Sequence, residues 1–158
     1  MVDGEVLATM SALIRSERPF EREAVARFFG ERGWLVVSSY PIPCAWEFKG
    51  VDVLYRPGET DADTSIDFVL HEESADWGPL EPDEQLAELG NVLAEVTAQL
   101  LTGLSGTFPV TEDAEAASGE TELFDVRRFQ VGSLFLSTGI YLGDGPLPTM
   151  VIAQLAPE

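Results

Sequence analysis

A long stretch of helical periodicity in the middle of the chain, with strand-like segments on both sides, restricts the fold more than any other feature. Apolar residues recur there every three or four positions, at Leu86, Leu89, Leu93, Val96, Leu100 and Leu104. This spacing places them on one face of an α-helix. Pro82 with the acids after it suits the start of a helix, and Gly106 and Pro109 suit its end. The pattern predicts one long helix over about residues 82–104.

Before and after this helix, apolar and polar residues alternate as they do in strands. Strands are predicted at about residues 34–39, 45–55, 65–71, 123–131, 134–142 and 147–155, with Lys49-Gly50 as a possible turn or bulge within the second segment. Helical spacing near the N-terminus predicts two shorter helices, at residues 4–16 and from Pro19 to about Gly33. Residues 111–122 are polar and acidic, and a loop is expected there. The order of elements predicts an α+β fold: an antiparallel sheet of about five to six strands, with the N-terminal helices and the long helix packed on one face.

The length of 158 residues suits a single domain, taken here as residues 1–158, that buries its core without a metal or a disulfide. Cys44 is the only cysteine, so no intramolecular disulfide can form. The N-terminus lacks the basic start and apolar run of a signal peptide, and no apolar run reaches the roughly 18 residues that span a membrane. A cytoplasmic location without membrane association is therefore expected.

Charge is distributed unevenly along the chain. The net charge is −19, and the 70 residues between Arg56 and Arg127 carry 18 Asp and Glu and no Lys or Arg. Residues 1–56 have 8 acids against 7 bases, and residues 127–158 have 2 of each. An anionic field repels nucleic acid and anionic membranes and attracts basic surfaces. Two interpretations stay open: a surface that serves solubility, and a docking surface for a cationic partner.

The second interpretation predicts a set of partner-binding residues in the region 59–84: Asp61, Asp63, Glu72, Glu73, Asp76, Trp77, Asp83 and Glu84. Trp77 stands within an acidic segment, where solubility alone does not require a large aromatic side chain. Buried aromatic anchors contribute much of the binding energy of protein interfaces. The predicted partner is a basic protein, and the chain itself is expected to be a monomer or a homodimer.

Residues that usually carry catalysis or bind metals are few. The sequence at His71 does not match the HExxH zinc motif, because Ala75 stands four residues after it. Cys44 has no basic neighbour close in sequence and is expected to be a small buried apolar residue. One arginine of the pair Arg127 and Arg128 is expected to bind an acid of the long helix or of a loop, with substrate binding as the alternative. No catalytic residue, metal or cofactor is predicted.

Three parts of the chain carry a resemblance to a known group of proteins: the helical start that ends at Arg32-Gly33-Trp34, the helix at 82–104 between strand blocks, and the closing strands. This layout resembles small actinobacterial immunity proteins of polymorphic toxin systems. The resemblance implies a stoichiometric inhibitor without catalytic residues, whose acidic loops and Trp77 would imitate the anionic substrate of a basic toxin. Two further classes stay open: a dimeric, acidic secretion or assembly chaperone, and a small enzyme with a pocket near His71.

Overall fold

The computed structural model describes residues 2–16, 20–37, 44–59, 64–73, 82–113, 123–141 and 149–157. Within these ranges the chain forms three helices: α1 (Gly4–Arg15), α2 (Arg22–Glu31) and α3 (Pro82–Ser105). The strands are β1 (Leu35–Val37), β2 (Cys44–Phe48), β3 (Val51–Arg56), β4 (Ser65–Glu73), β5 (Val110–Glu112), β6 (Leu123–Val131), β7 (Leu134–Tyr141) and β8 (Thr149–Pro157). At residues 73, 82 and 83 the backbone alone is described. The predicted α+β class is confirmed.

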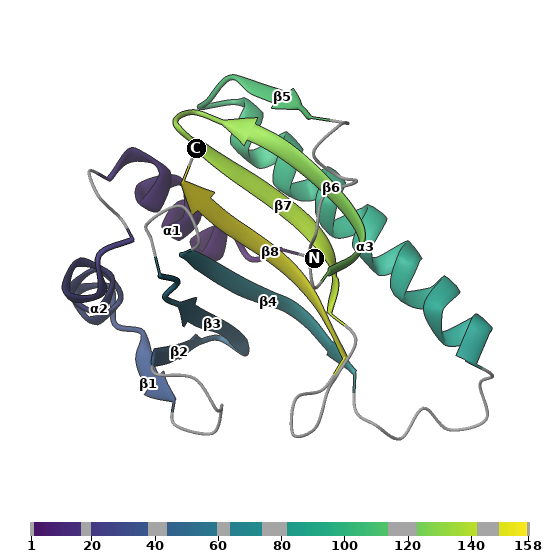
Figure 1. Ribbon diagram of the computed structural model, residues 1–158, viewed down its shortest axis with the longest axis horizontal. Helices are drawn as coiled ribbons and strands as arrows, with labels where there is room; N and C mark the ends of the chain where they lie inside the picture. The colour runs from purple at the N-terminus through teal and green to yellow at the C-terminus, as the bar shows by residue number, and fades with distance from the viewer. Residues whose placement is uncertain are drawn as a thin grey trace.

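The eight strands form one antiparallel sheet in the order β1-β2-β3-β4-β8-β7-β6-β5 (Figure 1). Strands β1 to β4 make one meander and strands β5 to β8 a second, and α3 leads from the first to the second. The two meanders join in the middle of the sheet, where β4 pairs with β8. Each half therefore consists of helical structure followed by four strands: α1 and α2 precede β1 to β4, and α3 precedes β5 to β8. As a result, β1 and β5 occupy equivalent positions at the two edges.

The prediction of about five to six strands was too low. The segment predicted as one strand at 45–55 is two strands, β2 and β3. Lys49 and Gly50 have φ angles of 50° and 80° and separate them in a two-residue turn of the kind that closes hairpins. The other addition is β5, at the start of the segment predicted as a loop. Its residues Thr111 and Glu112 are polar, and their strand conformation comes from pairing with β6, which local sequence does not reveal.

Each N-terminal helix has a recognisable boundary. The Asp3 carboxylate caps α1 by accepting a 2.8 Å hydrogen bond from the backbone N–H of Glu5. The predicted stop of α2 at Gly33 is confirmed, because Gly33 has a φ of 81° and Trp34 donates a 3.0 Å backbone hydrogen bond to Phe29. The rings of Trp34 and Phe29 also meet, with centroids 5.2 Å apart. This glycine-terminated end is a Schellman motif with its usual apolar contact. The predicted start at Pro19 lies outside the described residues.

All three helices contribute to one hydrophobic core with the same face of the sheet. Phe29 of α2 stacks on Trp46 of β2, with ring centroids 4.9 Å apart, and a tilted contact of 6.4 Å joins it to Phe68 of β4. Farther along the sheet, Thr97 of α3 donates a buried 2.9 Å hydrogen bond to Thr138 of β7. This face of the sheet is therefore occupied by the protein's own helices.

The opposite face of the sheet, called here the helix-free face, has no described helix packed on it (Figure 1). A separate cluster of buried apolar residues from strands alone lies there: Ala45, Leu54, Val69, Met150 and Ile152. Gly139 of β7 pairs with Ile152 on this face. The start of β6 comes so close to it that a Cβ atom on Gly139 would lie 2.8 Å from the Cβ of Leu123. A glycine is required at this position because of that close approach.

Candidate functional site

Four of the eight residues predicted to bind a partner lie outside the described residues: Asp61, Asp63, Asp76 and Trp77. The other four lie at two places in the fold. Glu72 and Glu73 are at the C-terminal end of β4, paired with Met150 and Thr149 of β8, whereas Asp83 and Glu84 are in the first turn of α3. The side chains of Glu72 and Glu84 are exposed. The docking role of the whole set stays a prediction.

The described charges separate along the sheet. The acids of α3, of the β5 region and of β6 are Asp83, Glu84, Glu88, Glu95, Glu112, Asp113 and Asp125, and β6 also carries Arg127 and Arg128. Three of the four acids on α3, Glu84, Glu88 and Glu95, have exposed side chains and lie along one stripe of the helix, which has no Lys or Arg anywhere in its sequence. In contrast, α1, α2 and β1 to β3 carry acids and bases in similar numbers. We call the part formed by α3, β5 and β6 the acidic end. In the described part of the chain, no helix has the length and apolarity to cross a bilayer.

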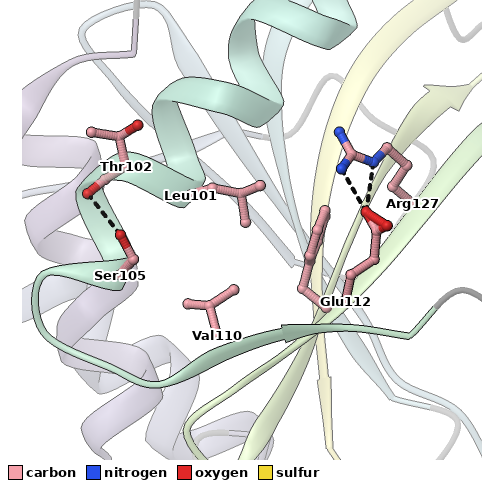
Figure 2. A pocket seen from close by; sticks show the side chains of 7 residues that line it. Leu101, Thr102, Ser105, Val110, Glu112 and Arg127 are labelled. Atoms are coloured by element: carbon pink, nitrogen blue, oxygen red, sulfur yellow. Dashed lines mark hydrogen bonds and ion pairs between the residues drawn. The ribbon is translucent and has the colours of Figure 1, made fainter.

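A shallow groove of about 450 Å³ lies at this acidic end, between the C-terminal part of α3 and strands β5 and β6 (Figure 2). The apolar part of its lining consists of Leu101, Val110 and Phe129. The polar and charged part consists of Thr102, Ser105, Glu112 and Arg127. The groove is open to solvent. It therefore offers a surface on which a side chain of another molecule can pack, and it does not enclose a reacting group.

Arg127 and Glu112 form an ion pair beside this groove. The Nε and Nη2 atoms of Arg127 donate hydrogen bonds of 3.0 and 2.5 Å to one carboxylate oxygen of Glu112. The guanidinium of Arg127 also lies over the ring of Phe129, 5.1 Å from its centroid. This confirms that one arginine of the pair binds an acid of the segment predicted as a loop, although that acid belongs to β5. Because both side chains are about half exposed, the pair adds no more than about 1 kcal/mol to stability.

A row of polar side chains crosses the helix-free face. Four of them are aligned on neighbouring strands: Arg128 of β6, Ser137 of β7, Gln154 of β8 and Asp67 of β4. Asp67 is only 1% exposed, and its Oδ2 atom lies 2.9 Å from the Nε atom of Arg56. The same guanidinium lies over the ring of Tyr141, 5.5 Å from its centroid. Since β3 and β7 are separated by two strands, this contact shows that Arg56 reaches across the face.

Sequence reasoning did not identify this row. Three of its members come from consecutive strands, β6 to β8, and the fourth, Asp67, comes from β4, far away in the chain; the pairing of β4 with β8 aligns it with the others. One signal was present in the sequence, because Asp67 interrupts the apolar run from Ile66 to Leu70. A charge at such a position is buried on the second face of the sheet and needs a partner there. The identity of that partner, Arg56, depends on the pairing of β3 with β4.

The two residues considered for an enzyme, Cys44 and His71, lie far apart along the helix side of the sheet. Cys44 is half-buried and packs against the helix-side core, in agreement with its predicted apolar role. Cys44 of β2 pairs with Tyr55 of β3, which in turn pairs with Ile66 of β4. Ile66 stands five residues before His71 on that strand. At about 3.3 Å per residue, the two positions are about 16 Å apart along the strand. A register shift in β4 also sets His71 opposite Val151 of the helix-side core, and ends the predicted alternation.

The described side chains offer recognition by charge and by apolar contact. Within the described ranges, no three side chains of His, Cys, Asp or Glu lie close enough together to hold a metal ion. The acidic stripe of α3 and the open groove next to it are the surfaces best suited to contact a macromolecule. No family model, no curated protein and no solved structure matches this chain.

Proposed function

We propose that this chain is a non-catalytic binding protein that neutralises a basic protein partner, as an immunity protein inhibits a toxin domain. The observation that carries this proposal is the acidic end. There, α3 exposes Glu84, Glu88 and Glu95 along one stripe, without a base on the helix. A surface that served solubility alone would work equally well with both signs mixed. A surface of one sign attracts a partner of the opposite sign.

The physical role of this surface is to accelerate encounter. Fields of one sign raise association rates by roughly 10- to 1000-fold at low salt, and exposed charges alter the association rate more than the final affinity. The groove in Figure 2 lies at the C-terminal part of the same helix, beyond Glu95, and supplies the apolar contact that charges alone do not provide. Leu101, Val110 and Phe129 of its lining can receive an apolar side chain of the partner.

The test compares two triple charge reversals of equal size. One variant changes acids of the α3 stripe: Glu84→Lys, Glu88→Lys and Glu95→Lys. The matched control changes exposed acids of the balanced end: Glu5→Lys, Glu21→Lys and Glu47→Lys. Both variants change the net charge by the same amount. The partner for this measurement is the basic domain encoded beside the gene for this chain, or a protein captured from the native host.

Stopped-flow association of the partner at several salt concentrations gives the result. The α3 variant should associate at least tenfold more slowly than the wild type at low salt, with a flatter salt dependence. The control variant should stay within about twofold of the wild type. Equal slowing of both variants would contradict a localised docking surface, and unchanged rates in both would contradict electrostatic attraction altogether.

A second readout separates inhibition from chaperoning. An immunity protein abolishes the activity of its folded partner at a one-to-one ratio, whereas a chaperone binds a partner that is still unfolded or unassembled. We expect the purified partner to lose its activity on addition of one equivalent of this chain. Binding without loss of activity would support the chaperone class in place of the inhibitor class.

A further inference from the structure

The two edges of the sheet differ in chemistry although they occupy equivalent positions. The β5 edge is polar, with Thr111 and Glu112 exposed and Glu112 paired to Arg127. The β1 edge is Leu-Val-Val, in which Leu35 is 70% and Val36 is 81% exposed. Natural sheets protect a free edge with charges, proline or a bulge, because an apolar edge strand readily pairs with another strand. β1 contains no charge and no proline, and its pairing with β2 is regular.

Both faces of β1 are apolar. Val36 is paired with Trp46, whose side chain belongs to the helix-side core, and Leu35 is paired with Glu47 on the other face. A continuous apolar run is typical of a strand that is covered on both faces. Among the described residues, no strand pairs with the side of β1 away from β2. The backbone N–H and C=O groups on that side can therefore pair with a strand of another molecule.

We propose that this molecule is a second copy of the chain, and that two β1 strands pair antiparallel about a two-fold axis at Val36. Leu35 of one copy then lies opposite Val37 of the other, and the two eight-stranded sheets join into one sheet of sixteen strands. Antiparallel pairing within one sheet keeps both helix layers on the same side. The interface is isologous, as in most two-fold dimers.

The distribution of charge favours a second copy at this edge. β1 belongs to the balanced part of the chain, in which residues 1–56 have 8 acids and 7 bases. In the acidic end, α3 packs on β7 and β8, four to five strand spacings from β1 or about 19–24 Å, and β5 lies seven spacings away, or about 34 Å. All these distances exceed two Debye lengths at physiological salt, about 8 Å each. Pairing at β1 therefore separates the two acidic ends as far as the fold permits and leaves both free for a partner.

The flanking helix extends the contact beyond β1. A three-residue strand covers much less than the roughly 800 Å² per partner that a stable interface needs. α2 directly precedes β1 in the chain, with the turn at Arg32 and Gly33 between them. Its exposed side chains and those of its C-terminal end include both signs: Arg22, Glu23, Arg27, Glu31 and Arg32. A two-fold axis can bring a base of one α2 near an acid of the other.

Sedimentation velocity on the full chain tests the proposal. Between about 1 and 500 µM, the range in which interfaces of modest affinity dissociate, the wild type should change reversibly from monomer to dimer. Val36→Lys places a charge at the two-fold axis and should weaken dimerisation at least tenfold. Thr111→Lys, the same change at the equivalent edge β5, should dimerise as the wild type does. Both side chains are exposed, so neither variant should lose its fold, which circular dichroism checks.

A cross-link reports the register. In a Cys44→Ser background, Val36→Cys should form a disulfide-linked dimer on mild oxidation, because opposed residues of antiparallel strands have Cα atoms about 4.5–5.5 Å apart, within disulfide reach. Thr111→Cys in the same background should not. A wild type that stays monomeric over the whole range overturns the proposal and leaves β1 to a strand of a different protein. A Val36→Lys variant that dimerises like the wild type, or equal cross-linking at both positions, overturns it as well.

Discussion

Replacement of Gly139 by alanine tests how closely β6 lies against β7 on the helix-free face. An added Cβ would lie 2.8 Å from the Cβ of Leu123, 3.2 Å from the carbonyl oxygen of Phe124 and 3.2 Å from Cγ2 of Val126. Nonbonded carbon atoms prefer about 3.5–4.0 Å, so the contact with Leu123 requires a movement of about 1 Å. The Cβ of Leu123 is attached to the backbone and cannot rotate away. The strand itself must move.

Two effects of opposite sign determine the magnitude. Overpacking of a buried site costs about 1–3 kcal/mol, whereas the loss of glycine from the unfolded chain stabilises by about 0.4–1 kcal/mol. The steric cost is the larger, because two of the three contacts involve backbone or the atom next to it. We expect Gly139→Ala to lower the free energy of unfolding by about 1–2 kcal/mol. For a chain of this length, the melting temperature should fall by about 2–8 °C.

Gly90→Ala is the matched control. Gly90 lies within α3, and an added Cβ there would meet no atom within 4 Å. Removal of a glycine from a helix interior stabilises it by about 1 kcal/mol, so this variant should melt at a higher temperature. Urea unfolding followed by circular dichroism measures both changes. If Gly139→Ala is as stable as the wild type while Gly90→Ala gains stability, β6 does not lie against Gly139 as described.

Three further predictions concern buried polar contacts and the predicted anchor. Asp67→Ala leaves Arg56 on the helix-free face without its buried carboxylate and should cost about 3 kcal/mol in urea unfolding; a cost below 1 kcal/mol would show that water already screens the pair. Thr97→Val should cost about 1–2 kcal/mol, and the double variant with Thr138→Val should cost less than the sum of the two single variants, since the pair is then removed together. Trp77→Ala should weaken the binding free energy of the basic partner by about 2 kcal/mol or more. The loss should come from a faster dissociation rate, without a change in the association rate. An unchanged dissociation rate, measured by surface plasmon resonance, would remove this residue from the interface.

Elements with a long or locally specified pattern were predictable from the sequence. α3 repeats its apolar spacing over about five turns, from Leu86 to Leu104, so its predicted range of 82–104 differs from the observed Pro82–Ser105 by one residue. The strand predicted at 123–131 is β6, because alternation and a following glycine turn act together there. The stop of α2 at Gly33 follows from local backbone chemistry, since a positive φ suits glycine.

Features that depend on how strands pair with one another were not predictable. β5 has three residues and two of them are polar, so its strand conformation depends on β6. The register shift in β4 that turns His71 toward the helix side is likewise set by β8. The contact of Arg56 with Asp67 requires the alignment of β3 and β4. The acidic stretch, in contrast, was visible in the sequence, and the structure adds that its helical part is one exposed stripe.

The seam between β4 and β8 has a consequence for the order of assembly. Within each meander, strands pair with their neighbours in sequence, and such short-range hairpins form quickly. The seam joins Ile66 to Leu155, which are far apart in the chain, so its closure carries the larger loop entropy and comes late. Until then, each nascent half presents an unpaired, apolar strand that later becomes the centre of the molecule. The risk of aggregation is therefore greatest before the seam closes, and it falls when the two halves meet.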